Sequence, residues 1–474
     1  MIGGPRDWVM KGVSALAAIN RRRLPEPAGP HPLLTGIHAP MPDELTLGEL
    51  EVDGAIPPEL DGRYLRIGPN PLKPDPRSYH WFIGDGMVHG VRLENGRALW
   101  CRNRWIRSAQ VAAELGVEAA PGPRHGGFDT VNTNVVGHAG RVLALVEAGS
   151  TPVELGDDLE EQRYSDFEGT LSGPFSAHPH RDPETGELHA ICYAADDPRH
   201  VRHVVVARDG RVRREVAVPV SGGPLVHDCA ITKRYVLIFD LPVTLSLGTL
   251  LRGYEFPYRW DPRHQARLGL LPLDGGAEDV KWIPLEPCFI FHAVNAFDLP
   301  DGRVALDAVV YDRMFTRDHA GPDENPRGLE RWTVDPSART VERIMLDPTP
   351  QEFPRLDERR IGRPYRYAYA LALPDSIEPR LVGEAPLLRH DLHTGERLEH
   401  RFGPGRVAGE FVFVPREAQA AEDEGWLLGL VIDARDDTSE LRIIDARRFA
   451  EPPVARVRLP HRVPPGFHGN WVAG

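Results

Sequence analysis

Short apolar or β-branched runs alternate with glycine-centred turns along most of the chain. One example is Met87–Leu93, which is followed by the turn Asn95-Gly96 and then by Ala98–Trp100. Two such runs on either side of a tight turn are typical of an antiparallel β-hairpin. The same pattern surrounds five further turns: Ala139-Gly140, Thr185-Gly186, Asp209-Gly210, Asp301-Gly302 and Thr394-Gly395. The pattern predicts a protein built mainly from β-strands.

These hairpin signals continue from about residue 60 to the end of the chain, with no long helical stretch or linker between them. We therefore expect one all-β domain over residues 35–474 and a separate lead-in over residues 1–34. A closed β-propeller is the favoured architecture, because radial repetition leaves only short sheet edges. Seven blades would hold about 68 of the 474 residues each. Since no Trp-Asp repeat is present, a WD40 array is disfavoured.

Two apolar segments do not show the pattern that predicts the blade strands. Trp8–Asn20 predicts an amphipathic helix, and the basic run Arg21–Arg23 follows it. Such a segment suits a helix on a lipid surface, a helix packed against the domain, or a frayed chain end. Its apolar positions are Trp8, Val9, Val13, Leu16 and Ile19. The second segment, Leu241–Leu251, is too short to span a membrane and fits either a partly exposed loop at a tunnel mouth or a buried strand.

Charge and cysteine content narrow the partners and the compartment. The formal net charge is -13, from 69 acidic and 56 basic residues, which disfavours binding to nucleic acid. The four cysteines form no CxxC pair, so neither a disulfide framework nor a thiolate metal site is expected. The N-terminus lacks the order of a signal peptide, and no apolar run reaches 18 residues. We expect a cytoplasmic protein that at most touches the inner face of the membrane.

Four of the twenty histidines share a local setting that suits a metal ligand. Each lies at the edge of an apolar run beside small or turn-forming residues, which would hold the imidazole rigidly. These histidines are His178, His227, His292 and His468. Inner strands of successive propeller blades converge on the axis, so residues this far apart in sequence can meet there. Imidazole ligands suit zinc, copper, iron or nickel, and the set alone does not choose among these metals.

Several longer motifs resemble the carotenoid cleavage oxygenases. The motifs are Leu60–Pro71, His80–Gly90, Asn132–Asn134, Glu352–Arg355, Gly409–Pro415 and Gly466–Trp471. The resemblance spans roughly residues 35–474 and includes the order and context of the four histidines. It implies a seven-bladed β-propeller with one Fe(II) on its axis, held by four histidines and no carboxylate, and long loops that cap a substrate tunnel. The ligands carried over are the four histidines named above.

The resemblance also implies three glutamates behind the ligands, at Glu147, Glu352 and Glu410. A carboxylate that accepts the remote imidazole N–H fixes the tautomer and the ring orientation, and it supplies charge that neutral ligands lack. The fourth histidine would then need another acceptor. Four imidazoles leave two positions on the iron, enough for dioxygen and a water. The resemblance places Thr133 beside one open position, where it would shape access without acting as an acid or base.

The reaction that the resemblance implies inserts O2 across a conjugated C=C bond of an apolar polyene and gives two carbonyl products. A related branch cleaves hydroxystilbenes and uses a tyrosine and a lysine to hold the phenol oxygen. Here those positions align with Trp105 and Val146, which would extend an apolar wall and favour a carotenoid or apocarotenoid. Stilbene cleavage stays an alternative, as does the oxygen-independent isomerisation of the retinoid isomerohydrolases. From another class, a propeller that only binds ligands or proteins is the competing hypothesis.

Overall fold

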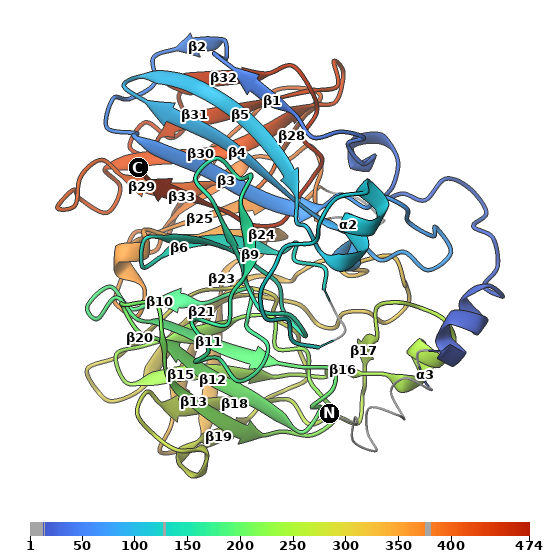
Figure 1. Ribbon diagram of the computed structural model, residues 1–474. Helices are drawn as coiled ribbons and strands as arrows, with labels where there is room; N and C mark the ends of the chain where they lie inside the picture. Colours follow the sequence, from blue (N-terminus) through green and yellow to red (C-terminus); the bar gives the residue numbers. More distant parts are fainter. Residues whose placement is uncertain (1–12, 14, 127–128, 375–380) are drawn as a thin grey trace.

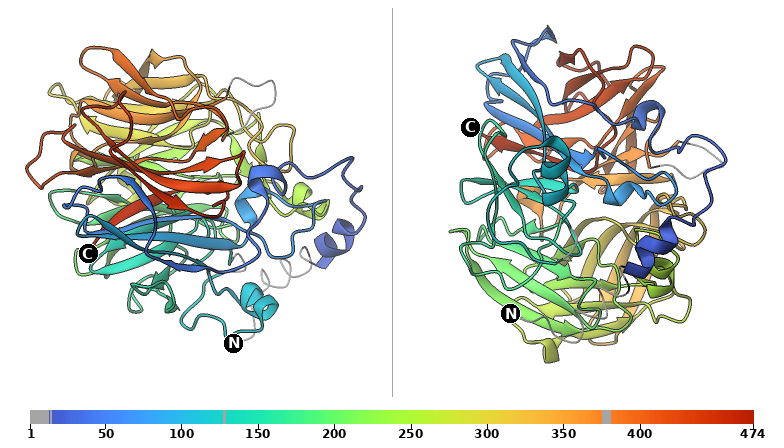
Figure 2. Two further views of the ribbon diagram at one scale, coloured as in Figure 1. Left: turned by 90° about the horizontal axis from the view of Figure 1, so that it is seen from above. Right: turned by 45° about the vertical axis from the view of Figure 1, so that its right-hand side comes forward.

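The computed structural model describes residues 13, 15–126, 129–374 and 381–474. Their strands form seven sheets of four to six strands, which are the blades of a seven-bladed β-propeller (Figures 1 and 2). A small two-stranded sheet, β16 (Val243–Leu245) with β17 (Tyr258–Trp260), lies outside the blades. The predicted all-β class and the predicted propeller are confirmed.

Five blades have four strands each. Their bounds are β6 (Asn134–His138), β7 (Arg141–Leu145), β8 (Val153–Leu155), β9 (Gln162–Tyr164); β10 (His180–Arg181), β11 (Leu188–Tyr193), β12 (His200–Val206), β13 (Val212–Pro219); β14 (Cys229–Ile231), β15 (Tyr235–Asp240), β18 (Arg267–Pro272), β19 (Lys281–Pro284); β20 (Ala293–Asp298), β21 (Val304–Val310), β22 (Gly328–Asp335), β23 (Thr340–Asp347); and β24 (Gln351–Arg355), β25 (Tyr367–Ala372), β26 (Leu387–Asp391), β27 (Glu396–His400).

The other two blades combine strands from both ends of the chain. The first contains β1 (Thr46–Gly48), β3 (Gly62–Pro69), β4 (Gly86–Glu94), β5 (Arg97–Trp105) and β33 (Gly469–Ala473). The second contains β2 (Val52–Gly54), β28 (Arg406–Ala408), β29 (Val412–Pro415), β30 (Gly425–Asp433), β31 (Thr438–Asp445) and β32 (Ala455–Leu459). Antiparallel pairing of β33 with β3, and of β2 with β32, closes the ring.

All six predicted hairpin turns join paired strands. At the first of them, Asn95 and Gly96 both have positive φ, at 50° and 72°, and they connect β4 to β5. Two successive left-handed residues make the turn whose twist matches that of the strands, and Asn-Gly is the sequence best suited to it. The residues of these turns therefore pair the flanking strands as predicted.

Each blade brings one residue to the axis at or directly before the start of its innermost strand. In the blade that contains β28 and β29, this residue lies between these two strands. Neighbouring innermost strands contact one another, as β14 does β20 and β33 does β6. In chain order these residues are Thr133, His178, His227, His292, Glu352, Glu410 and His468. The propeller thus collects side chains from a stretch of more than 330 residues at one place.

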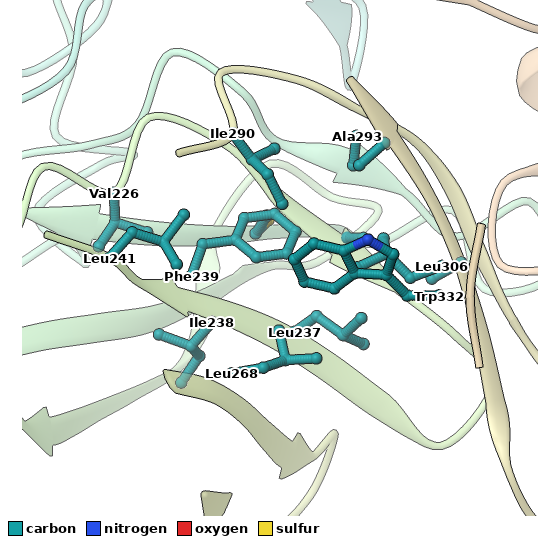
Figure 3. Close-up of a cluster of buried hydrophobic side chains, with 14 of the residues drawn as sticks. Val226, Leu237, Ile238, Phe239, Leu241, Leu268, Ile290, Ala293, Leu306 and Trp332 are labelled. Atoms are coloured by element: carbon teal, nitrogen blue, oxygen red, sulfur yellow. The ribbon is translucent and has the colours of Figure 1, made fainter. Parts of the chain in front are cut away.

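A large apolar cluster holds two of these strand starts in position. Figure 3 shows Phe239 and Trp332 packed among the aliphatic side chains of neighbouring blades. Val226 and Ala293 belong to the same cluster and are the immediate neighbours of His227 and His292. Because close-packed interiors tolerate little movement, this cluster fixes the direction in which both imidazoles leave the backbone.

The N-terminal lead-in and α3 (Leu247–Leu251) lie side by side at one edge of the molecule, on the same side as α2 (Ala109–Leu115) (Figures 1 and 2). Residues 13 and 15–21 are helical, as predicted, whereas Trp8 lies outside the described residues. The Asn20 side chain donates to the Leu251 carbonyl at 2.6 Å. The two apolar segments singled out in the sequence therefore meet.

The segment Leu241–Leu251 matches the predicted buried strand only in its first half, where Val243 is a buried strand residue. Its second half is the helix α3 and not the predicted loop, and Leu247 on this helix is half exposed. Four 3₁₀ turns complete the described elements: η1 (Gly36–His38), η2 (Trp81–Ile83), η3 (Ala277–Asp279) and η4 (Glu358–Arg360). No helix in the described ranges has the length and apolarity needed to cross a membrane.

Candidate metal centre

Four imidazoles meet on the propeller axis. His178, His227, His292 and His468 are all buried, and each offers a ring nitrogen within 4.8 Å of the others. The Nε2 atoms of His227 and His292 are 3.2 Å apart, and those of His292 and His468 are 3.1 Å apart. The four histidines singled out from the sequence therefore form one cluster.

Three of the imidazoles are oriented by buried or nearly buried glutamates. In each pair the imidazole Nδ1 donates to a carboxylate oxygen, which leaves Nε2 as the unprotonated nitrogen that faces the cluster. The three hydrogen bonds are His227 to Glu147 at 2.8 Å, His292 to Glu352 at 2.5 Å and His468 to Glu410 at 3.0 Å. The predicted pairing of three glutamates with three of the histidines is present in the structure.

Two of these carboxylates are held on both oxygens. Glu352 also accepts hydrogen bonds from the Tyr311 hydroxyl at 2.8 Å and from the Phe353 backbone N–H at 2.7 Å. Glu410 accepts one from the Gly469 backbone N–H at 3.0 Å, and the Arg355 guanidinium is 3.7 Å away. A carboxylate with hydrogen bonds on both oxygens cannot rotate freely, so it fixes the orientation of the imidazole that donates to it.

The remaining histidine, His178, differs from the other three. Its Nε2 is buried and has no hydrogen-bond partner in the described part of the chain. A buried nitrogen without a partner is costly unless something else occupies it. The carboxylate or other protein acceptor that the fourth imidazole was expected to use is not seen among the described residues.

Charge and burial set protonation states in the cluster that favour binding of a cation. Burial lowers the pKa of His178 well below its usual value, and the neighbouring imidazoles lower it further. Burial opposes ionisation of Glu410, yet Arg355 and then His468 lower its pKa to about 2. Likewise, burial would raise the pKa of Glu352, but His292 beside it leaves this pKa below its usual value. At neutral pH the centre therefore presents a neutral imidazole at His178 and two ionised carboxylates behind its partners.

This donor set fits a transition-metal ion. Two nitrogen ligands that lie at right angles on one metal, about 2.1 Å from it, are about 3.0 Å apart. The two Nε2 separations in the cluster are close to this value, and the orphaned Nε2 of His178 gains a partner if a metal binds. The described residues bring four imidazoles and no cysteine or carboxylate to the centre, so the set suits a first-row metal without selecting one.

One side of the cluster opens onto a narrow apolar cavity of about 50 Å³. Its aromatic lining consists of Phe82, Tyr193, Phe256, Tyr258, Phe291, Phe353 and Phe467. Thr133 and Val146 also line it, next to His227, His292 and His468. The Thr133 hydroxyl donates to the Asn132 side chain at 2.9 Å, which fixes it beside the metal position.

The comparisons with known proteins agree with this geometry. Residues 38–473 match the family model described as "Retinal pigment epithelial membrane protein". A carotenoid cleavage oxygenase of Mycobacterium tuberculosis is 41% identical over 93% of this chain and 97% of its own length. The chain belongs to the carotenoid oxygenase family.

Two solved members of the carotenoid oxygenase family superpose closely on this chain. Cobalt-substituted Synechocystis ACO gives a TM-score of 0.81 at 30% identity, over 92% of this chain and 97% of that one. A lignostilbene dioxygenase from Pseudomonas brassicacearum gives 0.84 at 30% identity, over 95% of this chain and all of that one. The fold is therefore shared with relatives named for two different substrates.

Trp105 is the one candidate site residue that lies away from the cluster and the apolar cavity. Its ring packs with Met41, Met87 and Val111, and its indole N–H donates to the Asn70 carbonyl at 2.8 Å. Because the indole is already satisfied and buried in this separate cluster, it does not form one wall with Val146, contrary to what the alignment with the stilbene branch suggested.

Several residues that shape the site were not singled out from the sequence. Phe291, Phe353 and Phe467 line the cavity and directly adjoin His292, Glu352 and His468, so their position beside a ligand or its partner was an available signal. Tyr193 and Tyr258 had no such signal. They reach the cavity from the end of β11 and the start of β17, far in sequence from any ligand.

Proposed function

We propose that the protein is a non-haem Fe(II) dioxygenase, with one iron per chain, that cleaves a conjugated C=C bond of a carotenoid or apocarotenoid. The observation that carries this proposal is a four-imidazole centre, backed by three glutamates, that opens onto an apolar cavity. The overall change is balanced: one C=C bond and one O2 are consumed, and two C=O groups are formed. Iron, when bound by His178, His227, His292 and His468, would supply the activation of O2.

The chain's own residues would position the substrate. A polyene has no polar group along its conjugated part, so packing against aromatic side chains is what can select the bond that reaches the centre. Phe82, Phe256 and Phe291 would form this packing surface. Thr133 would narrow the space beside the metal and so restrict which end of the double bond approaches. The cavity holds only a short part of a long polyene, so the rest of the molecule must extend past these side chains.

Cleavage of a hydroxystilbene is the second candidate, because the lignostilbene dioxygenase superposes as well as the apocarotenoid relative does. Val146 argues against a phenolate at the position where that branch has a lysine, since an isopropyl group offers no charge or hydrogen bond. The apolar lining of the cavity favours the polyene.

The test is reconstitution with Fe(II) under anaerobic conditions, followed by oxygen and by β-carotene, an apocarotenal or resveratrol in parallel. Cleavage of a polyene into two carbonyl fragments with equimolar O2 uptake supports the proposal. Phenolic aldehydes from resveratrol alone would move the protein to the stilbene-cleaving activity. No O2 uptake and no cleavage of any compound by iron-loaded protein would favour a propeller that only binds.

We also propose that the lead-in helix and α3 touch a lipid surface, as an enzyme of insoluble polyenes requires. Leu16 and Ile19 are 53% and 51% exposed on the lead-in helix. Leu247 and Leu251 are exposed on α3, which the Asn20 side chain joins to the lead-in helix. A few residues after α3, Phe256 lines the apolar cavity, so this surface adjoins a cavity wall. Scattered exposed apolar residues are normal, but several of them on two joined helices beside a cavity wall suit an interaction surface.

This contact predicts that the double variant Leu16→Glu and Leu251→Glu sediments with anionic liposomes several-fold less than the wild type. The matched control is Ile344→Glu on β23, which is also exposed and apolar but lies on another blade. Equal sedimentation of all three proteins would refute the contact.

A further inference from the structure

The apolar cavity has one polar corner. Most of its lining is aromatic or aliphatic, yet Glu147, Tyr193 and Tyr258 also line it. The rings of Tyr193 and Tyr258 meet edge to face, with centroids 5.8 Å apart. Both tyrosines are almost fully buried, so their hydroxyls can be satisfied only by the protein or by something inside the cavity.

Glu147 is held differently from the other two glutamates behind the ligands. Its Oε1 accepts the His227 N–H, but its Oε2 is buried and has no hydrogen-bond partner. In contrast, Glu352 and Glu410 use both of their oxygens. Leaving a buried carboxylate oxygen unpaired is costly, and this oxygen belongs to a residue of the cavity wall.

The two tyrosines lie close enough to this carboxylate to feel its charge. Burial and then the Glu147 carboxylate raise the pKa of both phenols above the usual value. Both hydroxyls therefore stay protonated and able to donate. The Tyr193 hydroxyl interacts with Glu147 only beyond ordinary hydrogen-bond length, because the Glu147 Oε2 has no partner among the described residues.

We propose that Glu147, Tyr193 and Tyr258 form a subsite for a hydroxyl group on the conjugated substrate. A hydroxyl can donate to the free Glu147 oxygen and accept from a tyrosine at the same time. A carbonyl can only accept and would face the carboxylate, and a bare hydrocarbon would leave all three protein groups unpaired. The inference rests on the proposed function and names which members of that substrate class are preferred.

The subsite also limits where the hydroxyl lies. Only the His227 ring stands between the Glu147 carboxylate and the metal position. The substrate hydroxyl is therefore carried on the part of the molecule next to the cleaved bond, such as the end ring nearest to it. A ring-hydroxylated apocarotenoid and a hydroxystilbene share this chemistry, and two matched pairs of compounds distinguish them.

The experiment compares kcat/KM for an apocarotenal with and without a ring hydroxyl, and for resveratrol and its fully methylated ether. In the wild type we expect the hydroxylated member of a pair to be favoured about tenfold, mainly through KM, as for one buried hydrogen bond to a charged group. Preference in the apocarotenal pair identifies a hydroxylated polyene, and preference in the stilbene pair alone identifies a phenol. Equal values within both pairs would overturn the inference.

Variants show whether the preference comes from this corner. Tyr193→Phe and Tyr258→Phe should each reduce it, and the double variant should bring the ratio within about twofold of one. Tyr369→Phe is the matched control, because its hydroxyl is also buried and unpartnered but lies in another blade, on β25. A preference that survives in the double variant, or that Tyr369→Phe abolishes equally, would refute the subsite.

Binding to the metal-free protein separates this inference from the proposed function. Quenching of tryptophan fluorescence by each compound gives its Kd without any turnover. A tighter Kd for the hydroxylated member, with no cleavage by the iron-loaded protein, would keep the subsite and reject the dioxygenase. Cleavage of both members with equal Kd and equal kcat/KM would do the reverse.

Discussion

Two cavities of different size and polarity meet at the histidine cluster. The narrow apolar cavity reaches it from the side of Thr133 and Val146. A larger cavity of about 920 Å³ with a mixed polar and apolar lining reaches His178, His292 and His468 along the axis, and its charged lining includes Arg63, Arg355 and Asp228. Among the described residues, only His292 and His468 line both. The centre is thus a boundary between a narrow apolar cavity and a larger cavity that also contains charged groups.

The origin of this difference is visible in the backbone. Thr133 lines the apolar cavity and the next residue, Asn134, lines the axial one. His227 and Asp228 divide in the same way. Because successive side chains of an extended segment point in opposite directions, these two segments each supply one residue to each cavity. At these two segments, alternation along the chain therefore decides which side chain faces which cavity.

Replacing a histidine that lines both cavities should reduce metal binding and turnover more than any other change. His292→Ala deletes a ligand that lines both cavities, so we expect loss of bound metal and at least a 1000-fold loss of turnover. Metal content by mass spectrometry and cleavage rate measure the two effects. His393→Ala, an exposed histidine of the turn after β26, is the control and should match the wild type. A folded His292→Ala protein that retains metal would contradict the ligand assignment.

The next largest effect should be on metal affinity, where substitutions of Glu352 and Glu147 should differ. Glu352 is fully buried and held by three groups, whereas Glu147 keeps one free oxygen towards the apolar cavity. Glu352→Gln should weaken metal affinity roughly 10- to 100-fold, and Glu147→Gln should weaken it less. Competition with a chelator gives both affinities. The reverse order would show that the extra hydrogen bonds of Glu352 do not orient its histidine.

One substitution made in each cavity tests their separate roles. Val146→Phe fills the narrow apolar cavity, so kcat/KM for the polyene should fall roughly tenfold with metal content unchanged. Val136→Phe places the same ring in the large axial cavity and should change kcat/KM less than twofold. Circular dichroism and thermal unfolding check that both variants fold. Equal losses in the two variants would mean that the polyene does not use the apolar side.

Thr133→Val should have the smallest effect, because we assign the side chain to shaping the space and not to proton transfer. Its hydroxyl is already committed to Asn132. We expect kcat to stay within about threefold of the wild type, while the distribution of cleaved bonds shifts. Product chromatography and initial rates give both quantities. A loss above 100-fold would point instead to a catalytic hydroxyl.

The fold was predictable because its signals are local. Turns such as Asn95-Gly96 need left-handed backbone at both residues, and Asn-Gly is among the sequences that adopt it most readily. The ligands were predictable for a related reason: each histidine stands where an apolar strand begins, and all inner strands converge. Phe291 and Phe467, which adjoin ligands, follow from the same logic.

The substrate contacts were not predictable in the same way. Trp105 aligned with a residue of the stilbene branch, but its ring is drawn into a cluster with Met41 and Met87 that only the fold creates. Tyr193 and Tyr258 come from elements whose sequences carry no mark of a site. The arrangement of side chains around a cavity depends on how whole blades and loops pack, and this is a tertiary property that a single sequence does not display.

The most direct test is cleavage under ¹⁸O₂ by protein reconstituted with Fe(II), with the carbonyl products reduced at once to prevent exchange with water. If the protein is a dioxygenase, both fragments from one polyene carry one labelled oxygen each, and no product forms without O2. Label in only one fragment, oxygen drawn from water, or isomerised polyene formed in the absence of O2 would contradict this function.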